Sequence, residues 1–146
     1  MLETNVQMMG AVQLTLTDSS GIIKQQVECK NLVVTTGKEW IASRMTTSPA
    51  TLMSHMAIGT TNTTPANGNT TLITQVGRVA LTSTTRSGAQ ITYSAHFPAG
   101  TGTGAIVEAG IFNDGTAGSM LCRTAFAAIN KDVADTLTIN WTVTVL

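Results

Sequence analysis

Residues 136–145 have the sequence TLTINWTVTV, and this stretch decides the fold. Apolar side chains occupy every second position from Leu137 to Val145, and threonine or asparagine occupies the positions between them. Successive side chains of a β-strand point to opposite faces, whereas a helix would scatter the same apolar residues around its circumference. The stretch therefore predicts a strand with one buried face and one solvent-exposed face.

The same alternation recurs in residues 12–16 and in residues 90–97. Residues 105–112 are apolar on both parities, which is typical of a central strand covered on both faces. Further strands are expected in residues 22–34, 52–58, 79–81 and 120–126, with turns at residues 18–21 and 113–115 and a long loop over residues 59–69. About eight strands with few helices between them predict an all-β fold, an antiparallel two-sheet sandwich.

One short α-helix is expected near residue 36. Thr36 and Glu39 have the spacing of a capping box, in which each side chain bonds a backbone N–H of the first helical turn. Trp40–Met45 continues with apolar residues at helical spacing, and the helix should end before Ser48. A second, shorter helical turn is expected at Leu72–Val76.

The composition favours one domain, with residues 1–10 as an N-terminal arm and residues 11–146 as the β-sandwich. Charged residues make up only 11% of the 146 residues, against about 25% in an average soluble protein, and the formal net charge is zero. Such a chain lacks the basic surface that binds phosphate backbones, so nucleic acid is not an expected partner. We find neither a signal peptide nor a stretch of about 20 apolar residues, so no membrane partner is expected.

The sequence offers little for catalysis. His55 lies in an apolar run and His96 lies on the polar parity of its strand, and neither has Cys or carboxylate neighbours at metal-ligand spacing. No nucleophile elbow is present. We therefore expect no catalytic residue, no cofactor and no metal site.

Two kinds of buried polar group are expected. Glu108 lies in the strand covered on both faces, so its carboxylate must be paired, and Arg78 or Arg123 could neutralise it. Cys29 and Cys122 both lie in strand-like runs, where free cysteine behaves as a small hydrophobic residue. Two reduced thiols are favoured over a disulfide bond between them.

Several short segments, taken in their order, resemble a known group of proteins. They are NLVVTTGK at residues 31–38, MAIGT at residues 56–60, EAGIFN at residues 108–113 and DTLTINW at residues 135–141. The pattern looks like small structural proteins of tailed bacteriophages, which include capsid cement (decoration) proteins and tail-fibre-associated domains. The resemblance covers nearly the whole chain from Val12. It implies a jelly-roll-like β-sandwich that oligomerises on a virion surface and carries no catalytic residues.

This resemblance leads us to expect a capsid cement protein that binds the outer surface of the phage head and stabilises the shell. Its partners would be the major capsid protein and further copies of itself, as homodimers or homotrimers at capsid symmetry axes. It would be made in the bacterial cytoplasm. We favour cement because no repetitive shaft or heptad pattern is visible. The alternatives are a tail-fibre-associated or host-glycan-binding domain and, less favoured, a small hydrolase.

Two sets of residues are candidate interface residues. An apolar segment before the first strand has no obvious core partner, so it could be a docking arm or could cover one end of the sandwich. Two loops rich in Gly and Thr could be contact arms. The candidates are Leu2, Met8 and Met9 in the first set and Thr60, Thr61, Thr101 and Thr103 in the second.

Overall fold

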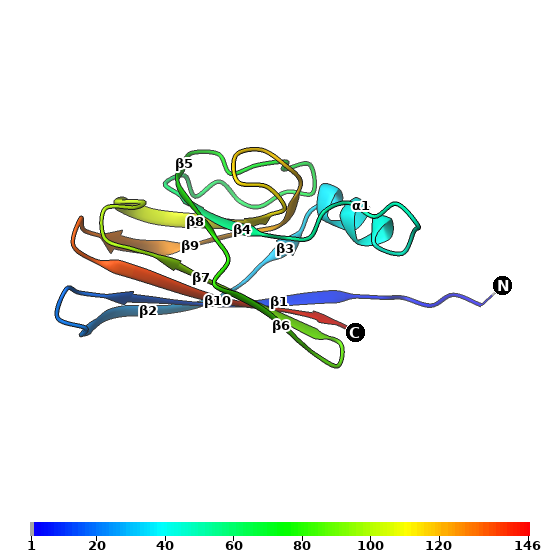
Figure 1. The fold of residues 1–146 in the computed structure, drawn as a ribbon, viewed down its shortest axis with the longest axis horizontal. Coiled ribbons are helices and arrows are strands. Elements are labelled where there is room, and N and C mark those ends of the chain that lie inside the picture. The colour runs from blue at the N-terminus through cyan, green and yellow to red at the C-terminus, as the bar shows by residue number, and fades with distance from the viewer. Residues whose placement is uncertain (1) are drawn as a thin grey trace.

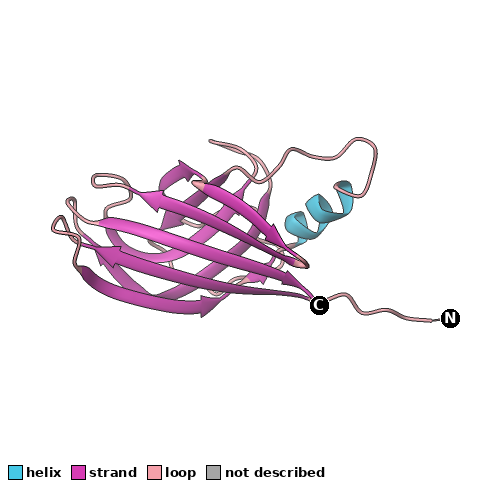
Figure 2. Ribbon diagram, turned by 60° about the horizontal axis from the view of Figure 1, so that its bottom comes forward, coloured by secondary structure: helices cyan, strands magenta, loops and turns pink. Residues whose placement is uncertain are grey.

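Two five-stranded antiparallel sheets pack face to face in the computed structural model, which describes residues 2–146 (Figure 1). Sheet A has the strand order β2-β1-β10-β7-β6, with the bounds β1 Met8–Thr17, β2 Ile23–Lys30, β6 Ser83–Ser87, β7 Gln90–Phe97 and β10 Thr136–Val145. Sheet B has the order β3-β9-β8-β4-β5, with the bounds β3 Leu32–Val33, β4 His55–Gly59, β5 Gln75–Ala80, β8 Gly104–Phe112 and β9 Met120–Lys131. The predicted all-β sandwich is confirmed, and Figure 2 shows the two layers.

Strand β10 is the centre of sheet A, as its alternating sequence predicts. It pairs with β1 on one side and with β7 on the other, so that Trp141 lies opposite both Val12 and Tyr93. Leu137, Ile139 and Trp141 are fully buried. In such a strand the backbone groups are hydrogen-bonded on both sides, and the apolar side chains are buried on the covered face.

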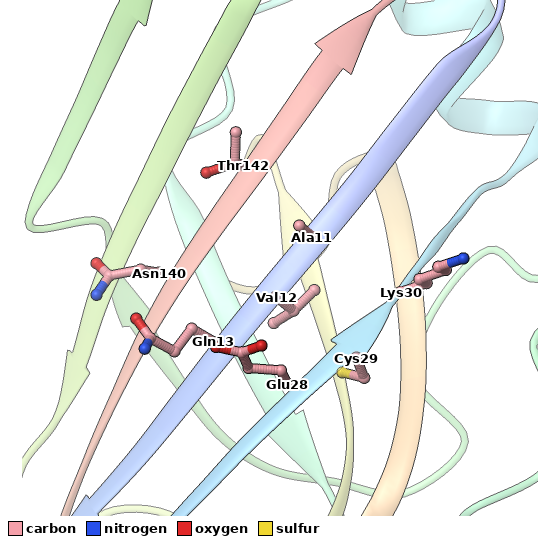
Figure 3. Close-up of a pocket in the computed structure, with 8 residues that line it drawn as sticks. All are labelled: Ala11, Val12, Gln13, Glu28, Cys29, Lys30, Asn140 and Thr142. Atoms are coloured by element: carbon pink, nitrogen blue, oxygen red, sulfur yellow. The ribbon is translucent and has the colours of Figure 1, made fainter.

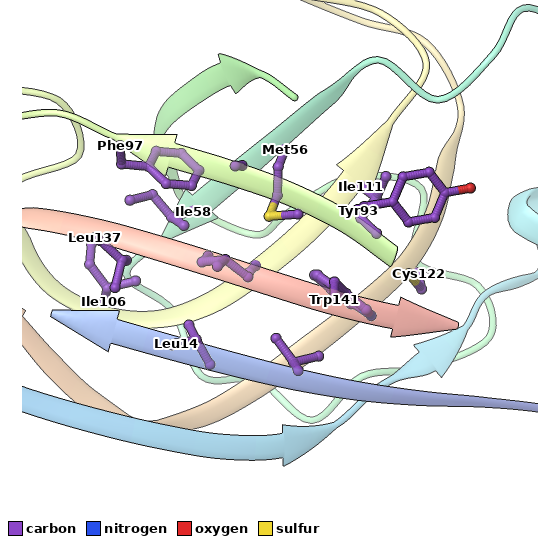
Figure 4. Packing of buried hydrophobic residues seen from close by; sticks show 14 of the residues in the cluster. Leu14, Met56, Ile58, Tyr93, Phe97, Ile106, Ile111, Cys122, Leu137 and Trp141 are labelled. Atoms are coloured by element: carbon purple, nitrogen blue, oxygen red, sulfur yellow. The ribbon is translucent and has the colours of Figure 1, made fainter. Parts of the chain in front are cut away.

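The core fills the space between the sheets (Figure 4). Its side chains come from alternate positions of β1, β7 and β10 in sheet A and of β4, β8 and β9 in sheet B; they include Leu14, Met56, Ile58, Tyr93, Phe97, Ile106, Ile111, Cys122, Leu137 and Trp141. Each large side chain that is fully buried contributes about 1.5–3 kcal/mol relative to an exposed one. The Trp141 Nε1–H donates to Asn31 Oδ1 at 2.9 Å, so its polar edge is also satisfied.

Strand β8 is covered on both faces, which confirms the interpretation of its continuous apolar run. Ile106, Ala109 and Ile111 belong to the core between the sheets. Phe112 belongs to a second cluster together with Leu72 of the loop that follows β4. This loop therefore covers part of the outer face of sheet B.

The helix α1, Thr35–Ser43, forms where expected, but the predicted capping box is wrong. Val34 is the N-cap residue, and no side chain caps the helix. The Thr36 hydroxyl instead donates to the carbonyl oxygen of Met120 at 2.8 Å, and Glu39 is exposed. The side chain that the local sequence assigned to the cap thus makes a tertiary hydrogen bond to β9 instead.

The helical turn expected at Leu72–Val76 is also wrong. Ile73 and Thr74 form a bend, and Val76 belongs to β5, which pairs along β4 so that Gly77 lies opposite Ile58. Pairing with a neighbouring strand satisfies the backbone groups that a helical turn would have satisfied internally.

Strand β1 also begins closer to the N-terminus than the sequence indicates. Strand β1 begins at Met8, where it pairs with Val145, so the boundary expected at residue 11 falls inside a strand. Met1, at the start of the predicted arm, lies outside the described residues. Residues 2–7 precede β1; Gln7 still pairs with Leu146, and the segment before it extends beyond the sandwich (Figure 1).

Candidate interaction surfaces

The first set of candidate interface residues lies at the end of the sandwich where the chain enters β1. Leu2 is fully exposed and Met9 is 52% exposed. Met8 is only half-buried and packs against the core, because β1 already includes it. Leu2 and Met9 are therefore available for contact with another molecule, whereas much of Met8 serves the sandwich itself.

The second set lies at the opposite end. Gly102, with φ of 71°, lies against Gly77 of β5 and Ile58 of β4, which holds the loop between β7 and β8 against sheet B. The same loop brings Gly104 next to the Thr60 methyl group. The structure thus gathers the four threonines at one end of the sandwich, far along the strands from Leu2 and Met9.

The four threonines differ in what they offer. Thr103 is exposed, and Thr60 and Thr101 are half-buried. The Thr61 hydroxyl is paired with the hydroxyl of Thr74 at 2.7 Å. Thr103 is therefore the most available of the four, whereas Thr61 helps to hold its own loop together.

A buried ion pair fastens the loop between β4 and β5 to sheet B. Glu108 and Arg123 are both fully buried, and Glu108 Oε2 accepts from Arg123 Nε at 3.1 Å and from Nη2 at 2.9 Å. The carboxylate also accepts the backbone N–H groups of Ile73 and Thr74, while Arg123 Nη1 donates to the carbonyl oxygen of Thr63 at 2.8 Å. Arg123, rather than Arg78, is thus the partner of Glu108. Because both charged groups bond to backbone groups of this loop, the pair has a structural role.

Arg78 serves another loop. Its guanidinium lies over the ring of Phe112, at 3.8 Å from the ring centroid. It also donates to the carbonyl oxygens of Asp114 and Ala117 at 3.0 and 2.9 Å. This cation therefore ties the predicted turn after β8, which forms as expected, to the edge of sheet B.

The two histidines are far from forming a common site. His55 Nδ1 lies 2.8 Å from the Ser54 hydroxyl, and His96 Nδ1 lies 3.2 Å from the Thr138 hydroxyl. Within residues 2–146 no carboxylate hydrogen-bonds to His55, so the Ser54–His55 contact lacks the orienting group of a nucleophilic triad. The same residues contain no cluster of three or more metal-ligating side chains. No helix in this range has the length and apolar character needed to cross a membrane.

Both cysteines are free thiols, as predicted. Burial raises the pKa of the Cys122 thiol well above its ordinary value. Burial also raises the pKa of Cys29, whose sulfur lies 3.3 Å from the hydroxyl of Thr124. Because the thiolate is the reactive form, neither cysteine has the character of a nucleophile.

The outer face of sheet A carries a shallow hollow across β1, β2 and β10 (Figure 3). It is lined by Ala11, Val12, Gln13, Glu28, Cys29, Lys30, Asn140 and Thr142. These eight residues supply amide groups, a hydroxyl group and one charge of each sign. The hollow therefore lacks the aromatic side chains on which a sugar ring stacks.

Fold and surfaces together define an all-β sandwich domain whose buried charges serve its own architecture. Comparison with protein-family models then identifies the group: residues 26–145 match the phage tail-collar fibre protein, N-terminal family. The match runs from β2 to β10 and covers well over half of the chain, so the chain belongs to this family and is a phage structural protein. Searches of curated proteins and of solved structures returned no significant match.

The family membership changes the balance between the two phage hypotheses. It supports the predicted phage structural protein but favours the tail-fibre alternative over capsid cement. The family is defined by an N-terminal part of a fibre protein, so the lack of a shaft in this sequence does not favour the capsid over the tail. The order of the quoted segments pointed to the phage group, but nothing in them distinguished tail from capsid.

Proposed function

We propose that this chain is a structural domain of a phage tail fibre, which binds other virion proteins near the tail collar and does so without catalysis. The family match over residues 26–145 is the observation that carries the proposal. Capsid cement, which the sequence first suggested, has no comparable support.

The surface is suited to assembly. All five residues of β6 are exposed, and β6 is the last strand of sheet A, so its outer backbone groups face solvent. Such an edge can accept a strand from another chain. The low charge of the whole sequence also removes much of the repulsion that keeps free monomers apart. Modest contacts of this kind become strong when many copies act together in one particle.

Immunogold electron microscopy of purified phage tests the location. Fab fragments raised against this domain should place gold at the tail collar and leave isolated, tailless heads unlabelled. Gold distributed over the capsid lattice, with bare tails, would overturn the proposal in favour of capsid cement.

A pair of variants tests the absence of catalysis. Phage carrying Ser54→Ala and His55→Ala should assemble and infect as well as the parent, since this hydroxyl–imidazole contact would then have no chemical role. Normal tails with a specific loss of infection in these variants would contradict a purely structural function.

A further inference from the structure

Sheet A lacks a strand beside the first residues of β1. Strand β2 pairs with β1 only as far as Lys30, which lies opposite Ala11, and the chain then crosses at Asn31 to sheet B. Strand β1 continues for three more residues, Met8–Gly10, which remain paired with β10 on the other side. Within residues 2–146, one side of Met8–Gly10 therefore has no neighbouring strand. We call this vacancy the β1 notch.

The backbone of Met8 points into the β1 notch. Gln7 and Leu146 exchange two backbone hydrogen bonds, of 3.3 and 2.8 Å, so they form a hydrogen-bonded pair of the antiparallel ladder. Such pairs alternate with non-hydrogen-bonded pairs, so the backbone groups of Met8 and Val145 must point away from each other. Val145 agrees, because its N–H donates to Ala89 on the far side at 2.9 Å. The N–H and C=O of Met8 are thus directed at the open side.

The β1 notch is walled by apolar side chains. A groove between β1 and α1 is lined by Val6, Gln7, Met8, Asn31, Leu32, Val33, Lys38 and Ile41. Asn31 Nδ2 is buried there and has no hydrogen-bond partner among the described atoms. Apolar walls beside an open strand edge are suited to an extended polypeptide.

The same chain carries a segment of matching chemistry. Residues 2–6, which we call the arm, extend away from the sandwich in both views (Figures 1 and 2). Leu2 is fully exposed and Val6 is 66% exposed. Both have the same parity as Met8, whose side chain faces the core, so in a strand added to sheet A they would face the apolar wall.

We propose that two copies of this chain pair through their arms and the start of β1. Residues 4–8 of one copy lie antiparallel to residues 4–8 of the other, around a two-fold axis at Val6. Backbone groups that point into the notch belong to even-numbered residues, so even positions must pair with even positions. Placing Thr4 of one copy opposite Met8 of the other lets the pairing end at Met9, before Gly10, against which Asn31 already packs. A register shifted two residues further along would bring Leu2 opposite Val12, where Cys29 of β2 already lies.

Charge agrees with this register. Glu3 of one copy would lie opposite Met9 of the other, two positions from Ala11 along β1. Lys30 is the partner of Ala11 on β2 and is exposed on the same face of the sheet. Glu3 of the other copy would then lie beyond Lys30, along the line that β2 leaves empty, so that opposite charges are neighbours. The pairing requires no particular location in the virion, so it stands or falls separately from the proposed tail function.

Light scattering after size-exclusion chromatography tests the pairing. The unmodified protein should be a concentration-dependent dimer, and Val6→Asp should be a monomer with an unchanged far-ultraviolet circular dichroism spectrum, because Val6 precedes β1. Ile22→Asp is the matched control, since Ile22 is 64% exposed at the other end of β1, and it should remain dimeric. A monomeric unmodified protein, a dimeric Val6→Asp variant, or dissociation by Ile22→Asp would overturn the proposal.

Cysteine trapping tests the register. In the proposed pair Val6 faces Val6, with Cα atoms about 5.5 Å apart, which a disulfide can span. Val6→Cys should therefore cross-link two copies on mild oxidation, whereas Thr4→Cys, which would face Met8, should not. Equal cross-linking of both variants would show a mobile arm in place of a paired strand.

Discussion

Arg123→Leu should destabilise the sandwich severely. The substitution leaves the Glu108 carboxylate fully buried without its cation and removes the donor to the Thr63 carbonyl oxygen. Removing one partner of a buried ion pair costs about 3–5 kcal/mol. Since a domain is stable by roughly 0.05–0.15 kcal/mol per residue, this loss is a large part of the total.

Urea unfolding followed by tryptophan fluorescence measures the effect. A loss of this size corresponds to roughly 10 °C in Tm for a chain of this length. Arg78→Leu is the matched control, because it removes the same charge from a half-buried site over Phe112 and should cost only about 1–2 kcal/mol.

The double variant Glu108→Leu/Arg123→Leu completes the cycle. Removing both charges avoids the lone buried carboxylate, so its loss should be smaller than the sum of the two single losses. A cost below about 1 kcal/mol for Arg123→Leu, or equal costs for Arg123→Leu and Arg78→Leu, would refute the reasoning from burial.

Two substitutions and one labelling experiment test other contacts. Gly37→Ala should lower the free energy of unfolding by about 1–3 kcal/mol, despite alanine's helix propensity, because the new Cβ would lie 1.9 Å from the Leu121 carbonyl oxygen. An unchanged urea midpoint would contradict the close packing. The hydrogen bond from Lys24 holds the pKa of Asp135 below its ordinary value, so the stabilisation by this pair is present above about pH 4 and is lost as the pH falls through the lower folded pKa. Asp135→Asn should therefore make Tm fall less steeply at acid pH. A variant whose Tm falls in parallel with that of the unmodified protein would exclude this role. Cys122 should react with a thiol reagent only as fast as the protein unfolds, and rapid labelling of the native protein would show that its burial is wrong.

Strands with a distinctive face were predictable from sequence. β10 and β7 each bury one face, so their residues alternate, and β8 is covered on both faces, so its residues are continuously apolar. β6 was missed because every one of its residues is exposed and none is apolar. It is a strand because it pairs with β7 through the turn at Gly88, where φ is 58°.

Local signals failed where tertiary contacts competed with them. Thr36 has the right spacing for a helix cap, but β9 offers its hydroxyl a carbonyl acceptor. Leu72 and Val76 have helical spacing, but Leu72 packs against Phe112 on the outer face of sheet B, while Val76 pairs in β5. In both cases the deciding partner is distant in the sequence, so no local pattern could reveal it.

The surfaces were less predictable than the fold. Burial of Glu108 required a cation, but only the register of β8 with β9, which sets Gly110 opposite Arg123, chooses between the two arginines. The β1 notch depends on where β2 leaves the sheet. Its one sequence signal is Asn31, which interrupts an otherwise strand-like run.

Cryo-electron microscopy of the intact phage tests the central claim most directly, that this sandwich is a structural part of the tail. The account predicts density near the tail collar into which the two five-stranded sheets and α1 fit as a body. Density for the same sandwich only on the capsid lattice would contradict it.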